Sequence, residues 1–132
     1  MFKATMIAGA GGFIGTCLRF LSEKLGGMIC PGVFPLGTFM ANVLGCLLIG
    51  VFYGWAANRK WFTEKYNLLL ITGLCGGFTT FSSFSDEMVG MLQNGSISTF
   101  VIYLLASIAI GLAAVVAGIM LVKKSPSKTQ ES

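Results

Sequence analysis

The stretch GGFTTFSSFSDE, from Gly76 to Glu87, places glycines, hydroxyl side chains and two adjacent carboxylates in the middle of uncharged sequence. Residues 66–75 before it and 88–122 after it carry no charge. Two glycines followed by two β-branched threonines disfavour a continuous helix. The sequence therefore predicts a helix that breaks within GGFTT, Gly76 to Thr80, and resumes at FSSFSDE.

The composition around this stretch is typical of a membrane protein. Hydrophobic residues make up 55% of the 132 residues and charged residues only 11%, about half the share usual in soluble domains. A helix of about 20 apolar residues crosses a bilayer core, and the gaps between charges predict four such spans, at 4–22, 36–57, 67–93 and 97–122. The predicted fold is an all-α integral membrane protein with one four-helix transmembrane domain, 1–122, and a disordered polar tail, 123–132.

Several function classes lack support in the sequence. The nine basic and five acidic residues are scattered, so there is no patch for nucleic acid. There is no histidine, and Asp86 and Glu87 have no third catalytic partner near them in sequence, so we expect no enzyme and no catalytic residues. The four cysteines have no metal-ligand spacing and are expected to pack as small apolar residues. The first span is expected to be an uncleaved membrane helix rather than a signal peptide.

Glycines at a spacing of four predict close contacts between the helices. Lipid is as apolar as leucine, so membrane helices attract one another by tight packing, which small residues allow. Three GxxxG pairs fall within the predicted spans: Gly11 with Gly15, Gly50 with Gly54, and Gly73 with Gly77.

Polar side chains within a span are candidates for function because they are costly in lipid. Arg19 lies near the end of the first span with Glu23 one turn later. It is either an interfacial arginine paired with Glu23 or part of a cationic vestibule that concentrates anions. Asn42 lies inside the second span with Thr38 one turn before it, and it either joins two helices or faces a hydrated path.

The predicted break supplies further polar groups. Carbonyls freed at membrane depth need protein, water or an ion, and broken helices in membranes use them to hold cations. Beyond the break, helical spacing places Phe81 and Phe84 on one face, with Glu87 close to it. Phenylalanine ring edges are positive, so two rings one turn apart could guide a small anion. The alternative is a packing pair of phenylalanines with helix-capping hydroxyls.

Three segments resemble the Fluc (CrcB) family of microbial fluoride channels: GLCGGFTTFSSFS (73–85), GGFIGTCLRF (11–20) and PLGTFMANVLGCLLIG (35–50). The resemblance covers nearly the whole chain except the tail. It implies a multi-pass protein of the cell (inner or plasma) membrane that passively exports fluoride. It also implies an antiparallel dimer with two pores and a structural Na⁺ at its centre.

The resemblance also implies roles for particular residues. Phe81 and Phe84 match pore-lining phenylalanines, and the carbonyls of Gly76 and Thr79 match the Na⁺ ligands. Asn42 matches an asparagine beneath the pore, Arg19 a vestibule arginine and Glu87 an acidic position on the polar track. Further candidates for that track, with hydroxyl side chains, are Thr38, Ser82, Ser83, Tyr103 and Ser107.

The distribution of basic residues complicates the implied dimer. Seven basic residues flank the spans on the side of the N-terminus, and only Arg19 and Lys24 lie on the other. Such a bias predicts one orientation, with both termini cytoplasmic. An antiparallel homodimer needs both orientations, so either the bias is overridden or the partner is a different subunit of opposite bias.

Two other classes fit the length of the chain. One is a four-span proton-coupled multidrug exporter, which requires a titratable carboxylate deep in a span. The other is a tetraspan assembly protein without transport activity, which would use the glycine contacts but not the polar residues.

Overall fold

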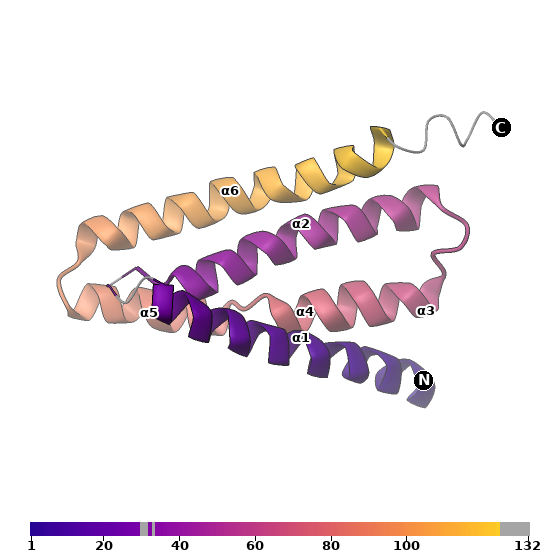
Figure 1. The fold of residues 1–132 in the computed structure, drawn as a ribbon, viewed down its shortest axis with the longest axis horizontal. Helices are drawn as coiled ribbons and strands as arrows, with labels where there is room; N and C mark the ends of the chain where they lie inside the picture. Colours follow the sequence, from indigo (N-terminus) through magenta and orange to yellow (C-terminus); the bar gives the residue numbers. More distant parts are fainter. Residues whose placement is uncertain (30–31, 33, 125–132) are drawn as a thin grey trace.

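The computed structural model describes residues 1–29, 32 and 34–124, and these are helical apart from short connections (Figure 1). Four stretches are long and apolar enough to cross a membrane, which confirms the predicted number of spans. They are α1 (Phe2–Ile29), α2 (Leu36–Asn58), a divided third span (Glu64–Gln93) and α6 (Ile97–Lys124). Cys30 and the part of the predicted tail from residue 125 onward lie outside the described residues.

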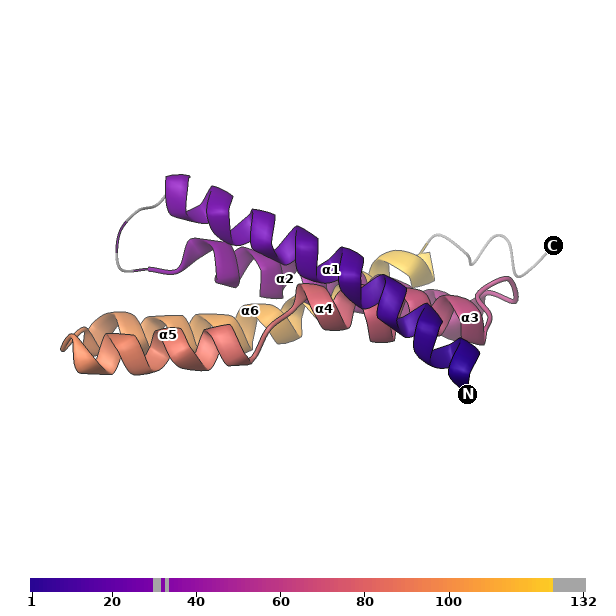
Figure 2. The ribbon, with the colours of Figure 1, turned by 90° about the horizontal axis from the view of Figure 1, so that it is seen from below.

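The third span is broken, as the sequence predicts. It comprises α3 (Glu64–Tyr66), the π-helix η1 (Asn67–Cys75), α4 (Gly76–Phe78) and α5 (Ser82–Gln93). Between α4 and α5 the backbone is extended at Thr79, with φ −80° and ψ 154°, and Figure 2 shows the extended link between the two helices.

The break lies later within GGFTT than its two glycines indicate. Gly76 and Gly77 remain helical in α4, and the chain leaves the helix only after Phe78. The reason lies in Thr79, whose backbone N–H and hydroxyl both donate to the Cys75 carbonyl oxygen at 2.9 Å. The threonine thus closes the last turn of α4 and ends it.

Two helix ends differ from the boundaries drawn at charged residues. The first helix continues past the predicted end at 22 to Ile29, because Arg19 pairs with Glu23 within the helix at 3.3 Å. Its last turns pack against α2, where a Cβ on Gly26 would come within 3.1 Å of the Leu36 carbonyl carbon. The third span begins at Glu64 rather than 67, since an acidic residue is favourable in a first helical turn.

The three GxxxG pairs lie at helix contacts, as predicted. On α1, a Cβ on Gly11 would lie 2.9 Å from Leu74 N, and η1 and α4 pack along that face. A Cβ on Gly77 of α4 would lie 3.1 Å from the Gly12 Cα of α1. On α2, a Cβ on Gly50 would lie 3.1 Å from the Gly118 Cα of α6. Close approach therefore joins α1 to the first half of the third span and α2 to α6.

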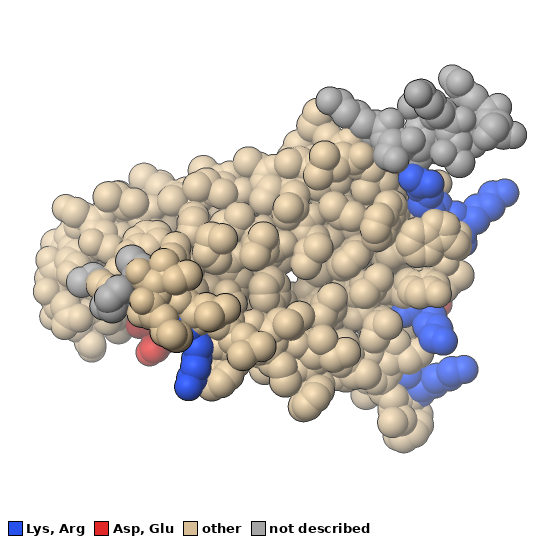
Figure 3. All heavy atoms as spheres, in the orientation of Figure 1, with Lys and Arg blue, Asp and Glu red and all other residues tan. Residues whose placement is uncertain are grey.

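The two ends of the helix bundle differ in charge (Figure 3). At the end of the bundle where α1 begins and α6 ends in Figure 1 lie four basic residues near the starts of α1 and α3 and the end of α2: Lys3, Arg59, Lys60 and Lys65. At the other end α5 turns into α6 through QNGS, where Gly95 adopts φ 76°, a left-handed conformation that glycine adopts freely.

Candidate functional site: a polar break in the third span

The polar residues of the third span gather in two places. The first is the break groove, an open cavity of about 420 Å³ where α4 gives way to α5, opposite α2 and α6. Its lining consists of Asn42, Thr79, Thr80, Phe81, Phe84, Leu104, Ser107 and Ile108. The second is the carboxylate cavity, of about 310 Å³, which contains Glu87 and lies nearer the α1–α2 connection.

In the break groove, Asn42 is bonded to the exposed backbone of the break. The N–H of Thr80 donates to Asn42 Oδ1 at 2.7 Å, and Asn42 Nδ2 donates to the Thr80 carbonyl oxygen at 3.1 Å. Of the two uses predicted for this amide, joining two helices is therefore the one that these hydrogen bonds show. One Nδ2 hydrogen remains, and the side chain also lines the groove.

The two phenylalanines of the groove differ in exposure. Phe81 ends the break and is 79% exposed in the single chain, whereas Phe84 is half-buried. Their ring centroids are 6.3 Å apart and the planes are tilted by 42°, so the rings do not stack face to face. Phe84 rests on Tyr103 of α6, with a centroid distance of 4.9 Å.

Ser107 gives the break groove an unused hydrogen-bond donor. Its hydroxyl oxygen is buried and has no hydrogen-bond partner among the described residues. A buried hydroxyl without a partner is costly. The groove thus combines a free hydroxyl, a free amide hydrogen and ring edges, and it contains no fixed positive charge. Such a set of weak donors suits a small anion that must be bound and released.

Around the break, side chains occupy some of the backbone carbonyl oxygens and leave others without a donor. Arg19 Nε donates to the Gly77 carbonyl oxygen at 3.2 Å, and Asn42 occupies that of Thr80. Within the described residues, no hydrogen-bond donor lies on the carbonyl oxygens of Gly76, Phe78 or Thr79. Gly76 is exposed and Thr79 half-buried, whereas Phe78 is buried. Among the described residues, the carbonyl oxygens of Gly76 and Thr79 are therefore unpaired and belong to residues that are not buried.

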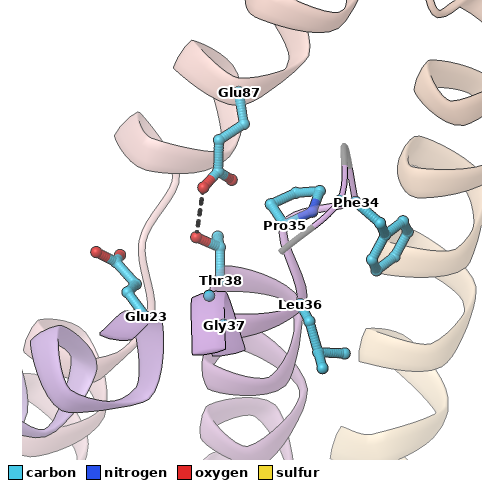
Figure 4. A pocket seen from close by; sticks show the side chains of 9 residues that line it. Glu23, Phe34, Pro35, Leu36, Gly37, Thr38 and Glu87 are labelled. Carbon is cyan, nitrogen blue, oxygen red and sulfur yellow. Dashed lines mark hydrogen bonds between the residues drawn. The ribbon is translucent and has the colours of Figure 1, made fainter. Parts of the chain in front are cut away.

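In the carboxylate cavity, Glu87 accepts hydrogen bonds from hydroxyl groups of two different helices. Thr38 of α2 donates to Oε2 at 2.7 Å (Figure 4), and Tyr103 of α6 donates to Oε1 at 2.9 Å. Glu23 of α1 lines the same cavity. Each of the two hydroxyls has only one proton to give, so neither donates to an ion while it bonds Glu87.

The remaining hydroxyl candidates lie at the start of α5. The Ser83 backbone N–H donates to the Thr80 hydroxyl at 3.1 Å, and the Ser82 hydroxyl lies 3.3 Å from that same hydroxyl. Neither serine is part of the groove lining in the single chain.

Sequence reasoning missed two participants, because both act through the backbone. One is Thr80, which pairs with Asn42, and the other is Gly77, which binds Arg19. A deep asparagine in the span opposite a predicted break is the signal that could have found the first.

Comparison with known proteins identifies close relatives. The sequence model of the family described as "CrcB-like protein, Camphor Resistance (CrcB)" matches residues 6–119. A protein of Azobacteroides pseudotrichonymphae named fluoride-specific ion channel FluC is 44% identical over 121 residues, covering 92% of this chain and 97% of its own. Proteins of the same name from Flavobacterium psychrophilum and Chlorobium phaeobacteroides are 37% and 40% identical over 122 residues, each covering 92% of this chain and 98% and 94% of their own.

Proposed function

Because the chain belongs to the CrcB family, we propose that it is a fluoride channel that lets fluoride leave the cell passively across the cell membrane. Membership of a channel family agrees with the expectation that the chain is not an enzyme. It also disfavours the multidrug exporter and the assembly protein. The chain has the multi-pass character that a channel requires, with four helices able to span a membrane.

The observation that carries this proposal is the break groove. Fluoride is small and strongly hydrated, so a pore must replace its water with other donors, none of which may hold it too tightly. The unpaired hydroxyl of Ser107, the free amide hydrogen of Asn42 and the edges of Phe81 and Phe84 meet this need. Thr38 and Tyr103, which bond Glu87 here, would continue the path towards the carboxylate cavity when their hydroxyls turn from that carboxylate to the ion, with Ser82 and Ser83 beside it.

The pore-lining groove is open on one side, which supports assembly as a dimer with two pores. Phe81 is 79% exposed in the single chain although its ring lies within a membrane span. A second subunit that covers this face would complete the wall of the pore. In an antiparallel dimer each subunit would contribute one such groove.

The unpaired carbonyls of the break fit a structural Na⁺ at the centre of that dimer. Carbonyl oxygens are suitable ligands for a hard cation, and those of Gly76 and Thr79 have no other partner here. Bound Na⁺ would be attracted by the partial negative charges of these carbonyl oxygens and would take the place of the missing hydrogen-bond donors. Arg19 donates to the neighbouring Gly77 carbonyl oxygen, so its guanidinium lies at the break.

The charge difference between the two ends supports insertion with both termini in the cytoplasm. A tag at the C-terminus, probed from each side of the membrane, tests the orientation. Labelling from both sides is the result expected of an antiparallel homodimer. Labelling from one side only would require a partner subunit of opposite charge bias.

The proposed activity is tested with the purified full chain in liposomes loaded with potassium fluoride. With valinomycin present to balance charge, we expect fluoride to leave within the time in which protein-free liposomes retain it. Liposomes loaded with potassium chloride are the control and should retain chloride. Fluoride efflux no faster than from protein-free liposomes would overturn the proposal.

A further inference from the structure

The backbone N–H and carbonyl of Thr80 have no helical hydrogen-bond partners. This residue stands in the break between α4 and α5, and its backbone N–H and carbonyl both point to the same side chain, Asn42 of α2. Within a membrane, each backbone N–H or carbonyl without a hydrogen-bond partner costs roughly several kcal/mol. One carboxamide therefore satisfies both polar groups of the peptide backbone at Thr80.

We propose that Asn42 is a positioning residue that fixes the break of the third span, in addition to lining the groove. Its amide replaces the two helical partners that Thr80 lacks and so sets where α5 begins. The consequence for ion flux rests on the proposed function, but the effect on the backbone does not.

The hydrogen bonds continue from Asn42 into α5. The Thr80 hydroxyl accepts the Ser83 backbone N–H at 3.1 Å and lies 3.3 Å from the Ser82 hydroxyl. Phe81, which follows Thr80, is the N-cap residue of α5, and its side chain has no polar atom that could accept a hydrogen bond from the first turn. Fixing Thr80 therefore also fixes the first turn of α5, and with it the ring of Phe81.

The backbone of Thr80 also decides which way the amide of Asn42 is turned. A backbone N–H can only donate, so the atom of Asn42 that meets it must be Oδ1. The Nδ2 atom then donates one of its two hydrogens to the Thr80 carbonyl oxygen, and its second hydrogen has no acceptor in this pair. The group left for the break groove is thus a donor, which suits an anion and not a cation. No other described side chain bonds the backbone of Thr80.

The test is amide hydrogen exchange at Thr80 in the purified full chain, resolved to single residues, together with fluoride efflux from liposomes. In Asn42→Ala we expect exchange at Thr80 to rise about tenfold or more, because the N–H loses its acceptor. We expect fluoride efflux to fall about tenfold or more in the same variant, because Phe81 is no longer held.

Asn58→Ala is the matched control. Asn58 lies on the same helix, and its amide donates to the Gly54 carbonyl within that helix at 2.9 Å, away from the break. Both exchange at Thr80 and fluoride efflux should stay within about twofold of wild type.

Asn42→Asp removes one of the two bonds to Thr80 and adds a negative charge. The carboxylate keeps an oxygen for the Thr80 N–H but has no hydrogen for the Thr80 carbonyl, so exchange at Thr80 should lie between that of the wild type and that of Asn42→Ala. Its negative charge on the anion path should still suppress efflux by about tenfold or more.

Several outcomes would overturn the inference. Exchange at Thr80 at the unprotected rate in the wild-type protein would do so without any variant, even if Asn42→Ala does not fold. So would unchanged exchange in Asn42→Ala. Full efflux from Asn42→Ala despite faster exchange would show that the break needs no fixing for conduction. A protected Thr80 in a protein that conducts no fluoride would support the positioning role and overturn only the proposed function.

Discussion

The two halves of the third span are held by different kinds of contact. Before the break, η1 and α4 lie against α1 backbone to backbone, through Gly11, Gly15, Gly73 and Gly77. After the break, α5 is joined to α2 and α6 by polar side chains and by aromatic packing, with fewer close backbone contacts. The first half depends on shape and the second on directional chemistry, and the candidate ion path lies along the second.

The strongest test of this difference adds volume to the first half. A Cβ on Gly15 would lie 2.8 Å from Phe78 N and 3.0 Å from the Leu74 carbonyl carbon. Both are backbone atoms, so no change of side-chain rotamer relieves the clash. We expect Gly15→Val to lower the stability of the fold by about 3 kcal/mol or more. Loss of the monodisperse peak in size-exclusion chromatography, or a lower midpoint of thermal unfolding, measures it.

Gly9→Val is the control for this experiment. Gly9 lies on the same helix, and a Cβ there would meet nothing within 4 Å. This variant should purify and unfold like the wild type. A Gly15→Val protein as stable as Gly9→Val would contradict the close packing of α1 on α4.

The glycine contacts of the first half could be predicted because they follow a local pattern. A spacing of four places two small residues on one helix face, whatever the partner is. The break could be predicted for a similar reason, since GGFTT is itself unfavourable for a helix. Its position within the motif could not, because it depends on the Thr79 hydroxyl reaching the Cys75 carbonyl.

The polar pairs of the second half could not be predicted from one sequence. Thr38 and Glu87 are 49 residues apart, and Asn42 and Thr80 are 38 apart. The sequence shows that each of these polar side chains needs a partner in the membrane. It does not show which partner, because several hydroxyls and carboxylates lie at similar depths. Backbone partners such as Thr80 carry no signal in the side-chain pattern at all.

In the second half, the largest effect on stability is expected at Glu87. A glutamine there presents one acceptor oxygen and an NH2 group, so either Thr38 or Tyr103 loses the acceptor for its hydroxyl proton. We expect Glu87→Gln to cost about 1–3 kcal/mol, because a hydrogen bond to a charged acceptor is lost. Chemical unfolding in detergent measures it.

A double-mutant cycle shows whether this cost belongs to the hydrogen bond. Tyr103→Phe removes the donor, and Tyr53→Phe is the control because Tyr53 is exposed. The double variant Glu87→Gln/Tyr103→Phe should lose about 1 kcal/mol less free energy of unfolding than the two single variants lose when their losses are added. Costs that simply add would show that Glu87 and Tyr103 act independently.

Phe81 should affect transport and leave the fold unchanged. Its ring is 79% exposed in the single chain, so Phe81→Ile removes few contacts within the subunit. If the ring edge lines the ion path, fluoride efflux should fall about tenfold, which corresponds to about 1.4 kcal/mol in the barrier. Phe13→Ile on α1, whose side chain is 73% exposed, is the control and should conduct normally. Normal efflux from Phe81→Ile would exclude the ring from the conduction mechanism.

The smallest effect is expected from the Thr80 hydroxyl, which accepts one N–H of the first turn of α5. Valine has nearly the same shape and leaves the two backbone bonds to Asn42 in place, so Thr80→Val removes only this cap and the contact with the Ser82 hydroxyl. The cost should be about 0.5–2 kcal/mol, as for other helix caps, and Thr80→Ser should recover most of it. Thermal unfolding of the three proteins, with exchange at the Ser83 amide, measures the difference. If Thr80→Val unfolds like the wild type while exchange at Ser83 rises, the backbone bonds to Asn42 hold the start of α5 without the cap.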